Sequence, residues 1–171
     1  AARPSMGKTA LALNIVQKTA LIHRVPCAVF SLEMSKEEVA SRMLSVQARM
    51  NSRHIRTGQL TQPDWERLAD VVKVLSSAPV YVDDRSGTTV LEIQSRCRQL
   101  KLEGKLGMVV LTDNANILPG DSEKLFNLVV RVPGTKFILA HIGGMNFRYW
   151  NIVALARTAD GFAMDNLYFD I

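Results

Sequence analysis

The sequence predicts an α/β fold in which a mostly parallel sheet is flanked by helices. Four short apolar runs have the length of buried strands, and they lie at residues 27–32, 79–83, 108–111 and 136–140. Segments with the apolar spacing typical of helices separate the first three of these runs. Strands that alternate with helices in this way form parallel sheets that are covered on both faces.

Residues 1–50 contain two expected helices. Leucine, isoleucine and valine recur at helical spacing from Thr9 to about Leu21. Ser35 and Glu38 form a capping box, because the serine hydroxyl can accept from the third backbone N–H while the glutamate reaches back to the cap. This box predicts a second helix that continues to about Met50.

Two further helices and a hairpin are expected downstream. A second capping box at residues 89–92 opens a helix that runs to about Glu103. The dipeptide Asp160-Gly161 lies between two apolar runs and predicts a C-terminal β-hairpin. The other helix spans residues 63–76, and its expected apolar face consists of Trp65, Leu68, Val71, Val72 and Leu75.

The composition describes a single globular domain over residues 1–171. The chain is 47% hydrophobic, 22% charged and 6% aromatic, which excludes disorder, collagen-like repeats and disulfide-stapled mini-proteins. Cys27 and Cys97 have no CxxC or metal-ligand spacing, so both are expected to be reduced core thiols. No run approaches the roughly 18 apolar residues of a membrane helix and no signal sequence is evident, so a cytoplasmic or organellar-matrix location is expected.

The formal net charge of +5 is concentrated at the amino-terminal end. Residues 1–58 contain nine Lys or Arg against three Asp or Glu, whereas the rest of the chain contains twelve against thirteen. A positive surplus placed there suits nucleotide phosphates, but by itself it does not indicate a nucleic-acid groove.

Gly7, Lys8 and Thr9 stand at the head of the first expected helix. The glycine lets the backbone wrap closely around phosphate oxygens, Lys8 supplies a point charge at the terminal phosphates, and the Thr9 hydroxyl can ligate magnesium. The general phosphate-loop pattern has a glycine where this chain has Ala2. The strand that should feed such a loop is missing, so the chain is expected to be a fragment of its domain.

Several motifs in one order resemble the DnaB-type replicative DNA helicases. The stretch AARPSMGKTALALNI at residues 1–15 resembles the phosphate loop of that family, in which alanine usually replaces the first glycine. The stretch FSLEMS at residues 30–35 resembles the second signature of the family. Residues 56–61, 64–65 and 82–84 resemble the segments that follow, so the likeness is continuous from residue 1 to about 111.

This resemblance implies a RecA-like P-loop ATPase domain that uses ATP and Mg²⁺. It further implies a homo-hexamer that encircles single-stranded DNA and unwinds duplex at the replication fork, with a primase and a helicase loader among its partners. The nucleotide contacts implied by the resemblance are made by Ala2, Arg3, Pro4, Ser5, Met6, Gly7, Lys8, Thr9 and Ala10.

Two carboxylates are candidates for the chemistry of hydrolysis. Glu33 follows an apolar strand and precedes a capped helix, where a carboxylate can activate water, and the resemblance makes it the catalytic base. A carboxylate after a neighbouring strand must hold hydrated magnesium, and Asp113 is the candidate. The family has its aspartate at the position that Thr112 occupies here, one residue before Asp113. A shift of one residue along a strand points a side chain to the opposite face of the sheet.

The resemblance weakens after Asp113. The stretch from there to Phe137 is too short for the DNA-contacting loops and long helical region of the family, so this region is expected to be shortened. His141 stands where a phosphate-sensing polar group is expected, although an ordinary histidine at a strand end is the simpler interpretation. Arg157 matches a basic position that acts on the neighbouring subunit's nucleotide, but Ala159 stands where the family has its arginine finger.

Two other functions stay open on the sequence alone. One is a recombinase-like or clock-protein-like ATPase of the same fold that binds DNA or protein without unwinding. The other is a nucleotide-binding module whose shortened second half has lost turnover.

Overall fold

The computed structural model describes residues 8–32, 34–112, 134–139 and 167–169. In these residues the four expected strands and the four expected helices are all present, together with one helix and one strand more. In chain order the elements are α1 (Lys8–Ile22), β1 (Cys27–Phe30), α2 (Lys36–Ala48), α3 (Ser52–Thr57), α4 (Gln62–Ser76), β2 (Val80–Asp83), α5 (Val90–Leu102), β3 (Met108–Leu111), β4 (Lys136–Leu139) and β5 (Leu167–Phe169).

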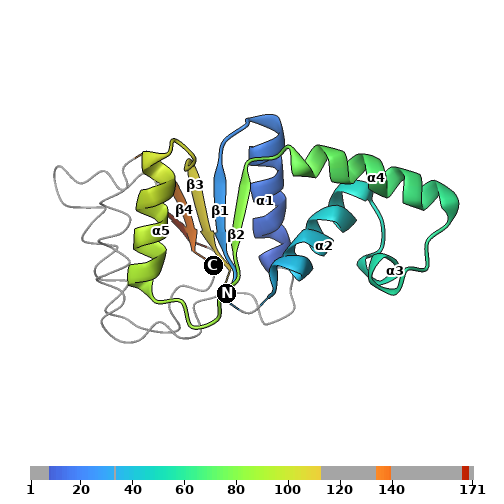
Figure 1. Cartoon of the computed structure of the whole chain (residues 1–171), viewed down its shortest axis with the longest axis horizontal. Coiled ribbons are helices and arrows are strands. Elements are labelled where there is room, and N and C mark those ends of the chain that lie inside the picture. Colours follow the sequence, from blue (N-terminus) through green and yellow to red (C-terminus); the bar gives the residue numbers. More distant parts are fainter. Residues whose placement is uncertain (1–7, 33, 113–133, 140–166, 170–171) are drawn as a thin grey trace.

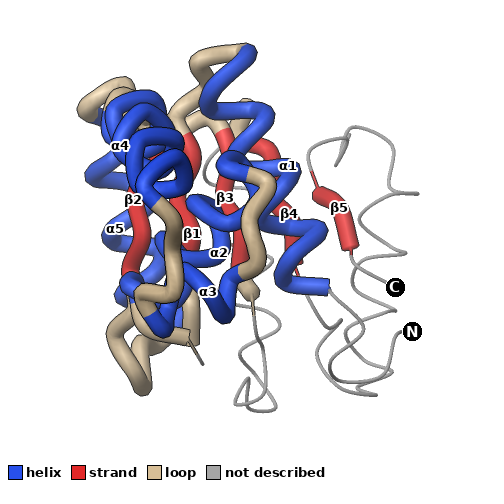
Figure 2. The backbone as a smooth tube through the Cα atoms, turned by 90° about the vertical axis from the view of Figure 1, so that its right-hand side faces the viewer, coloured by secondary structure: helices blue, strands red, loops and turns tan. Residues whose placement is uncertain are grey.

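The strands form one sheet in the order β2-β1-β3-β4-β5, and every neighbouring pair is parallel (Figure 2). Phe30, the last residue of β1, lies level with Asp83 of β2 and with Leu111 of β3. These three strands therefore end together at one edge of the sheet, which we call the carboxyl edge. In parallel α/β sheets ligands bind beyond this edge.

Helices cover both faces of the sheet, as the alternation of elements predicts. Figure 1 shows α1 against one face and α5 against the other. On the side of α1 a second layer follows, in which α2 contacts α1, and α3 and α4 contact α2. The short connection between α1 and β1 brings the C-terminal end of α1 to the start of β1, so the first turn of α1 lies at the carboxyl edge (Figure 1).

The core lies between α1 and the sheet. Val16 and Ala20 of α1 are fully buried against Val29 and Val110, which are residues of the two central strands. All four residues of β1 and all four of β3 are buried, because a central parallel strand is covered on both sides. On the opposite face α5 buries Ile93, Cys97 and Leu100.

The two cysteines are reduced and buried, as the sequence predicts. Burial raises the pKa of Cys27 from an ordinary 9.0 to about 11 and that of Cys97 to about 12. At pH 8 we therefore expect disulfide-exchange reagents to modify Cys27 at least about 100-fold more slowly than an exposed thiol, because the thiolate is the nucleophile and the Cys27 side chain is fully buried. Absorbance of the released aryl thiolate measures the rate, and protein unfolded in about 6 M guanidinium chloride is the exposed control.

The same pKa shifts have a consequence for stability. The unfolded thiols ionise near pH 9, whereas the folded thiols keep their protons until about pH 11 to 12. The unfolded state therefore loses protons first, and the free energy of unfolding contributed by these groups falls as the pH rises above 9.

In the modification experiment, rapid modification of folded protein at pH 8 would contradict the buried placement of both thiols.

Three features differ from the sequence-based expectations or extend them. The short helix α3, with Asn51 as its N-cap and Gly58 at φ 69° as its C-cap, is not among the expected elements. The apolar face of α4 is not fully covered, since Trp65 and Val72 keep 50% and 46% of their surface exposed. The turn of the expected C-terminal hairpin lies outside the described residues, and β5 pairs parallel to β4.

Among the described helices, none combines the length and the apolar character that crossing a lipid bilayer requires.

Candidate phosphate-binding and hydrolysis site

The helix α1 places three of the predicted site residues at the carboxyl edge. It begins at Lys8 and continues with Thr9, whose side chain is half-buried, and Ala10. Four first-turn N–H groups of a helix have no partner within it, and they attract the oxygens of a bound anion. The N-terminus of α1 can therefore bind a phosphate group at the carboxyl edge. The expected contacts at residues 2–7 lie outside the described residues.

The first turns of α1 and α2 border the same groove. This groove has a volume of about 670 Å³, and Ala10 of α1 lines it together with Glu37 and Glu38 of α2. From there its lining continues along both helices and reaches Ser52 and Arg56 of α3. Farther along the two helices, the buried side-chain amide of Gln17 donates from Nε2 to the Met43 carbonyl oxygen at 3.1 Å. The two helices that follow the expected phosphate loop and the expected catalytic segment are thus fastened to each other.

The segment that contains Glu33 in the sequence is held by hydrogen bonds on both sides of that residue. The Ser31 backbone N–H donates to the Asp83 carbonyl oxygen at 2.9 Å, and the Ser31 hydroxyl donates to the Met34 carbonyl oxygen at 2.7 Å. Ser35 is the N-cap of α2, and its hydroxyl accepts from the Glu38 N–H, so the predicted capping box is present. Glu33 itself lies outside the described residues.

Thr112 follows the last residue of β3, at the position where the family resemblance predicts an aspartate. Thr112 is 6% exposed, and both its backbone N–H and its hydroxyl donate to the Phe30 carbonyl oxygen, at 3.1 and 3.3 Å. Its side chain therefore serves the pairing of β3 with β1. The predicted magnesium ligand Asp113 is the next residue and lies outside the described residues.

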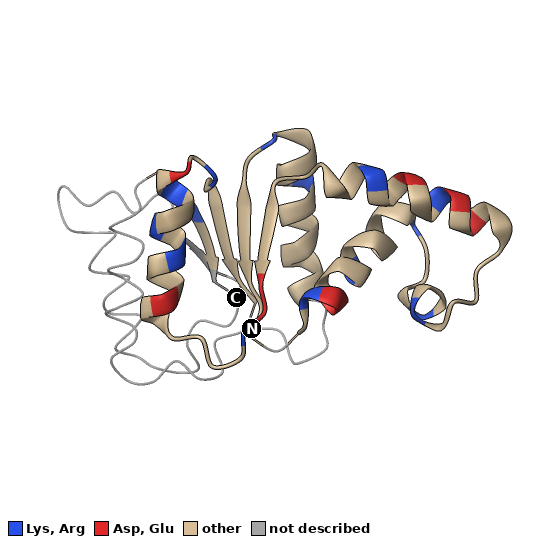
Figure 3. Ribbon diagram, viewed as in Figure 1, with Lys and Arg blue, Asp and Glu red and all other residues tan. Residues whose placement is uncertain are grey.

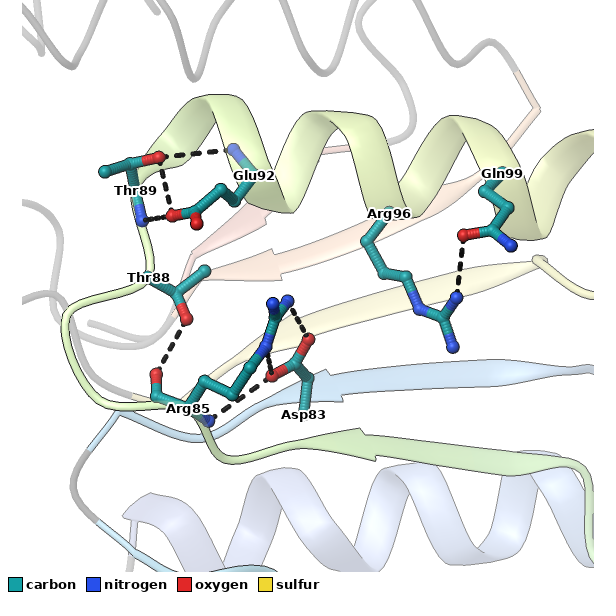
Figure 4. Close-up of polar contacts among 7 residues, drawn as sticks. All are labelled: Asp83, Arg85, Thr88, Thr89, Glu92, Arg96 and Gln99. Atoms are coloured by element: carbon teal, nitrogen blue, oxygen red, sulfur yellow. Dashed lines mark hydrogen bonds and ion pairs between the residues drawn. The ribbon is translucent and has the colours of Figure 1, made fainter.

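A second groove at the carboxyl edge lies between β2 and α5, and the sequence motifs do not indicate it. Its volume is about 550 Å³, and its polar lining comes mainly from the loop after β2 and from α5. The Arg85 guanidinium donates two hydrogen bonds to the Asp83 carboxylate, from Nε to Oδ1 at 2.9 Å and from Nη2 to Oδ2 at 2.7 Å (Figure 4). These hydrogen bonds hold the pKa of Asp83 below its ordinary value.

The charge at this edge is mixed. Figure 3 shows acidic residues at the end of β2 and in the first turn of α2. Glu92, in the first turn of α5, accepts from both the N–H and the hydroxyl of Thr89, which lowers its pKa (Figure 4). Within the described ranges, no group of three or more histidine, cysteine, aspartate or glutamate side chains is arranged to hold a metal ion.

Two other predicted site residues lie outside the described residues. Arg157, the candidate that would act on a neighbouring subunit's nucleotide, falls there, and so does His141. Their roles therefore stay predictions. The hydroxyl of Thr9 and the carboxylate expected at Asp113 are oxygen ligands, which is the kind that Mg²⁺ prefers.

Comparison with known proteins identifies strong similarity over most of the chain. A family model described as the DnaB-like helicase C-terminal domain matches residues 1–125. The replicative DNA helicase DnaC of Bacillus subtilis (strain 168) is 42% identical over 127 residues, which is 74% of this chain and 28% of that protein. The replicative DNA helicase DnaB of Geobacillus stearothermophilus gives the same identity and the same coverage.

Solved structures agree with the fold. A structure of a DnaB-like replicative helicase, described with its interactions with primase, matches with a TM-score of 0.69 and 25% identity over 80% of this chain and 36% of that one. A second solved structure, described as an ATPase domain, matches with a TM-score of 0.67 and 24% identity, covering 80% of this chain and 53% of that chain. The chain spans 28% of the length of the two curated relatives.

Proposed function

The chain belongs to the DnaB-like helicase C-terminal domain family, and from this membership we propose that it is the ATP-driven motor of a replicative DNA helicase. The motor couples ATP hydrolysis to translocation on single-stranded DNA and thereby unwinds duplex. It works at the replication fork in the cytoplasm as a homo-hexamer, with a primase and a helicase loader as partners. The primase partner is supported by the solved helicase structure that was described with primase.

The observation that most directly supports the proposal is the meeting of two helix starts at the carboxyl edge. The first turn of α1, which begins at Lys8, borders the same groove as the first turn of α2, which follows Glu33 in the chain. Phosphate binding and water activation must take place within a few ångströms of each other, so a hydrolase needs such a juxtaposition.

Each residue of the proposed site has a separate task. The backbone of residues 2–7 and the Lys8 ammonium hold the phosphates of ATP, and the Glu33 carboxylate orients the attacking water and takes its proton. The Thr9 hydroxyl and the Asp113 carboxylate are the proposed ligands of Mg²⁺, which when bound neutralises charge on the phosphate oxygens. Arg157 of one subunit reaches the nucleotide of its neighbour and stabilises charge on the transferring phosphoryl group.

One observation favours a second candidate function, a nucleotide-binding module without turnover. Thr112 stands in the column expected for the metal-binding aspartate, and its hydroxyl is engaged with Phe30. If Asp113 does not reach the metal, ATP binds at α1 but is not hydrolysed.

The purified protein tests these proposals on a forked DNA with a fluorescent strand. We expect phosphate release from ATP on the order of 1 s⁻¹ or faster, together with release of the labelled strand, because the motor couples the two. A blunt duplex without a single-stranded tail is the matched control and should stay intact. Phosphate release without unwinding would favour an ATPase of another kind, and nucleotide binding without phosphate release would favour the module without turnover.

A further inference from the structure

A carboxylate in the loop after β2 contacts the start of a helix that is distant in the sequence. Oδ2 of Asp84 accepts a hydrogen bond from the backbone N–H of Lys36 at 2.8 Å. Lys36 is the first residue of α2, and Asp84 directly follows the last residue of β2. This bond joins the β1–α2 connection to the β2–α5 connection at the carboxyl edge.

The Lys36 N–H needs an external partner because it is one of the four first-turn donors that a helix leaves unpaired. The local cap satisfies two other donors: the Ser35 side chain accepts from the Glu38 N–H, and the Glu38 carboxylate accepts from the Ser35 N–H. A carboxylate at this place also faces the positive end of the helix dipole. The bond from Lys36 to Asp84 is therefore charge-assisted, which makes it stronger than a neutral one.

The two neighbouring aspartates have separate tasks, and this leaves Asp84 available for α2. The Arg85 guanidinium binds both carboxylate oxygens of Asp83 (Figure 4). The ion pairs found in the described part of the chain do not include Asp84, and this residue is half-buried at the N-terminus of α2.

The end of β2 thus holds the β1–α2 connection at both of its ends. At the first end, the Asp83 carbonyl oxygen accepts from the Ser31 N–H at 2.9 Å. At the other end, the Asp84 carboxylate accepts from the Lys36 N–H. Residue 33 lies between these two attachments in the chain.

We propose that Asp84 is a positioning residue for ATP hydrolysis. By fastening the N-terminus of α2 to the end of β2, it sets where the segment with Glu33 stands relative to the phosphate-binding start of α1. The inference rests on the proposed function, in which Glu33 activates water. Asp84 acts through the backbone of α2 and leaves nucleotide binding to α1.

Two substitutions remove this bond from opposite sides. Asp84→Ala removes the acceptor. Lys36→Pro removes the donor, and proline is well tolerated at the first helical position. The preceding residue, Ser35, already has the extended conformation that a following proline requires, at φ −66° and ψ 158°.

Matched controls keep the bond while changing the same side chains. Asp84→Asn retains a side-chain oxygen that can accept from Lys36, and Lys36→Ala retains the backbone N–H while it removes the ammonium. A third control, Asp70→Ala, removes an exposed aspartate of α4 that pairs with Lys73 on the same helix.

The readouts are kcat for ATP hydrolysis, the Kd of a fluorescent ADP analogue, and thermal unfolding followed by circular dichroism. We expect Asp84→Ala and Lys36→Pro each to lower kcat by about 10-fold to 100-fold, since a displacement near 1 Å has effects of that order. The Kd should change by less than about threefold, and the three controls should keep kcat within about threefold. The double variant should lose no more than either single one, because both remove the same bond.

The proposal is overturned if Lys36→Pro folds and keeps the kcat of the unchanged protein. It is also overturned if both variants weaken nucleotide binding as much as they lower kcat, since that pattern indicates general loss of structure. Should Asp84→Ala fail to fold, Lys36→Pro and Asp84→Asn still decide the question. Absence of ATP hydrolysis in the unchanged protein would instead refute the proposed function.

Discussion

Replacing Lys8 by alanine should abolish ATP turnover, with a fall in kcat/KM of at least about 100-fold to 1,000-fold. The ammonium is the point charge that the proposed site places at the terminal phosphates, where negative charge is highest. Alanine is the best helix former, so α1 should still begin at the same place. Phosphate release under saturating ATP and magnesium measures the loss.

The same helix provides the control for this substitution. Lys18 lies on the exposed side of α1, so Lys18→Ala removes an equal charge without touching the helix start. We expect Lys18→Ala to retain turnover within about twofold, because an isolated surface charge has little effect on a site more than a Debye length of about 8 Å away. Equal turnover in Lys8→Ala and the unchanged protein would show that the phosphates bind elsewhere.

Most of the fold could be predicted because local signals and apolar patterns agree. The capping boxes at Ser35 and Thr89 mark the starts of α2 and α5 by side-chain contacts within one helical turn. Such contacts join residues only three positions apart, so the sequence alone predicts them. The apolar runs at β1 and β3 are equally clear, since a strand covered on both faces has no polar alternation.

The elements that the sequence does not predict, or predicts only in part, lack such signals. The helix α3 has six residues and no buried side chain, so no apolar periodicity marks it. For α4 the apolar stripe correctly indicates a helix, but burial depends on what the tertiary structure places against it. A pattern shows that a face is apolar, and it does not show how much of that face another element covers.

Sequence motifs name the candidate site residues, but they do not show which contacts connect the segments that contain these residues. One tripeptide names Lys8 and Thr9 as candidates, and α1 begins at Lys8, where the sequence predicts a helix start. The bond between Asp84 and Lys36 joins residues 48 positions apart, and it exists only because β1 and β2 are paired in register. Contacts of this kind follow from strand order, which local sequence patterns do not determine.

Replacing Glu33 by glutamine should separate ATP binding from ATP hydrolysis. Glutamine has nearly the same shape as glutamate, but its amide cannot take a proton from the attacking water. We expect kcat to fall by about 100-fold to 10,000-fold, the range over which a positioned general base contributes. The Kd for ATP should stay within about threefold, because the phosphate contacts at α1 are unchanged.

Glu66→Gln is the matched control for this prediction, since Glu66 lies exposed on α4 and lines neither of the two grooves. The two variants change the net charge equally, so an effect of net charge alone would lower kcat in both. A loss confined to Glu33→Gln requires a proton-accepting group at that residue. If Glu33→Gln hydrolyses ATP normally, another group activates the water, and positioning by Asp84 would then have to act on a different step.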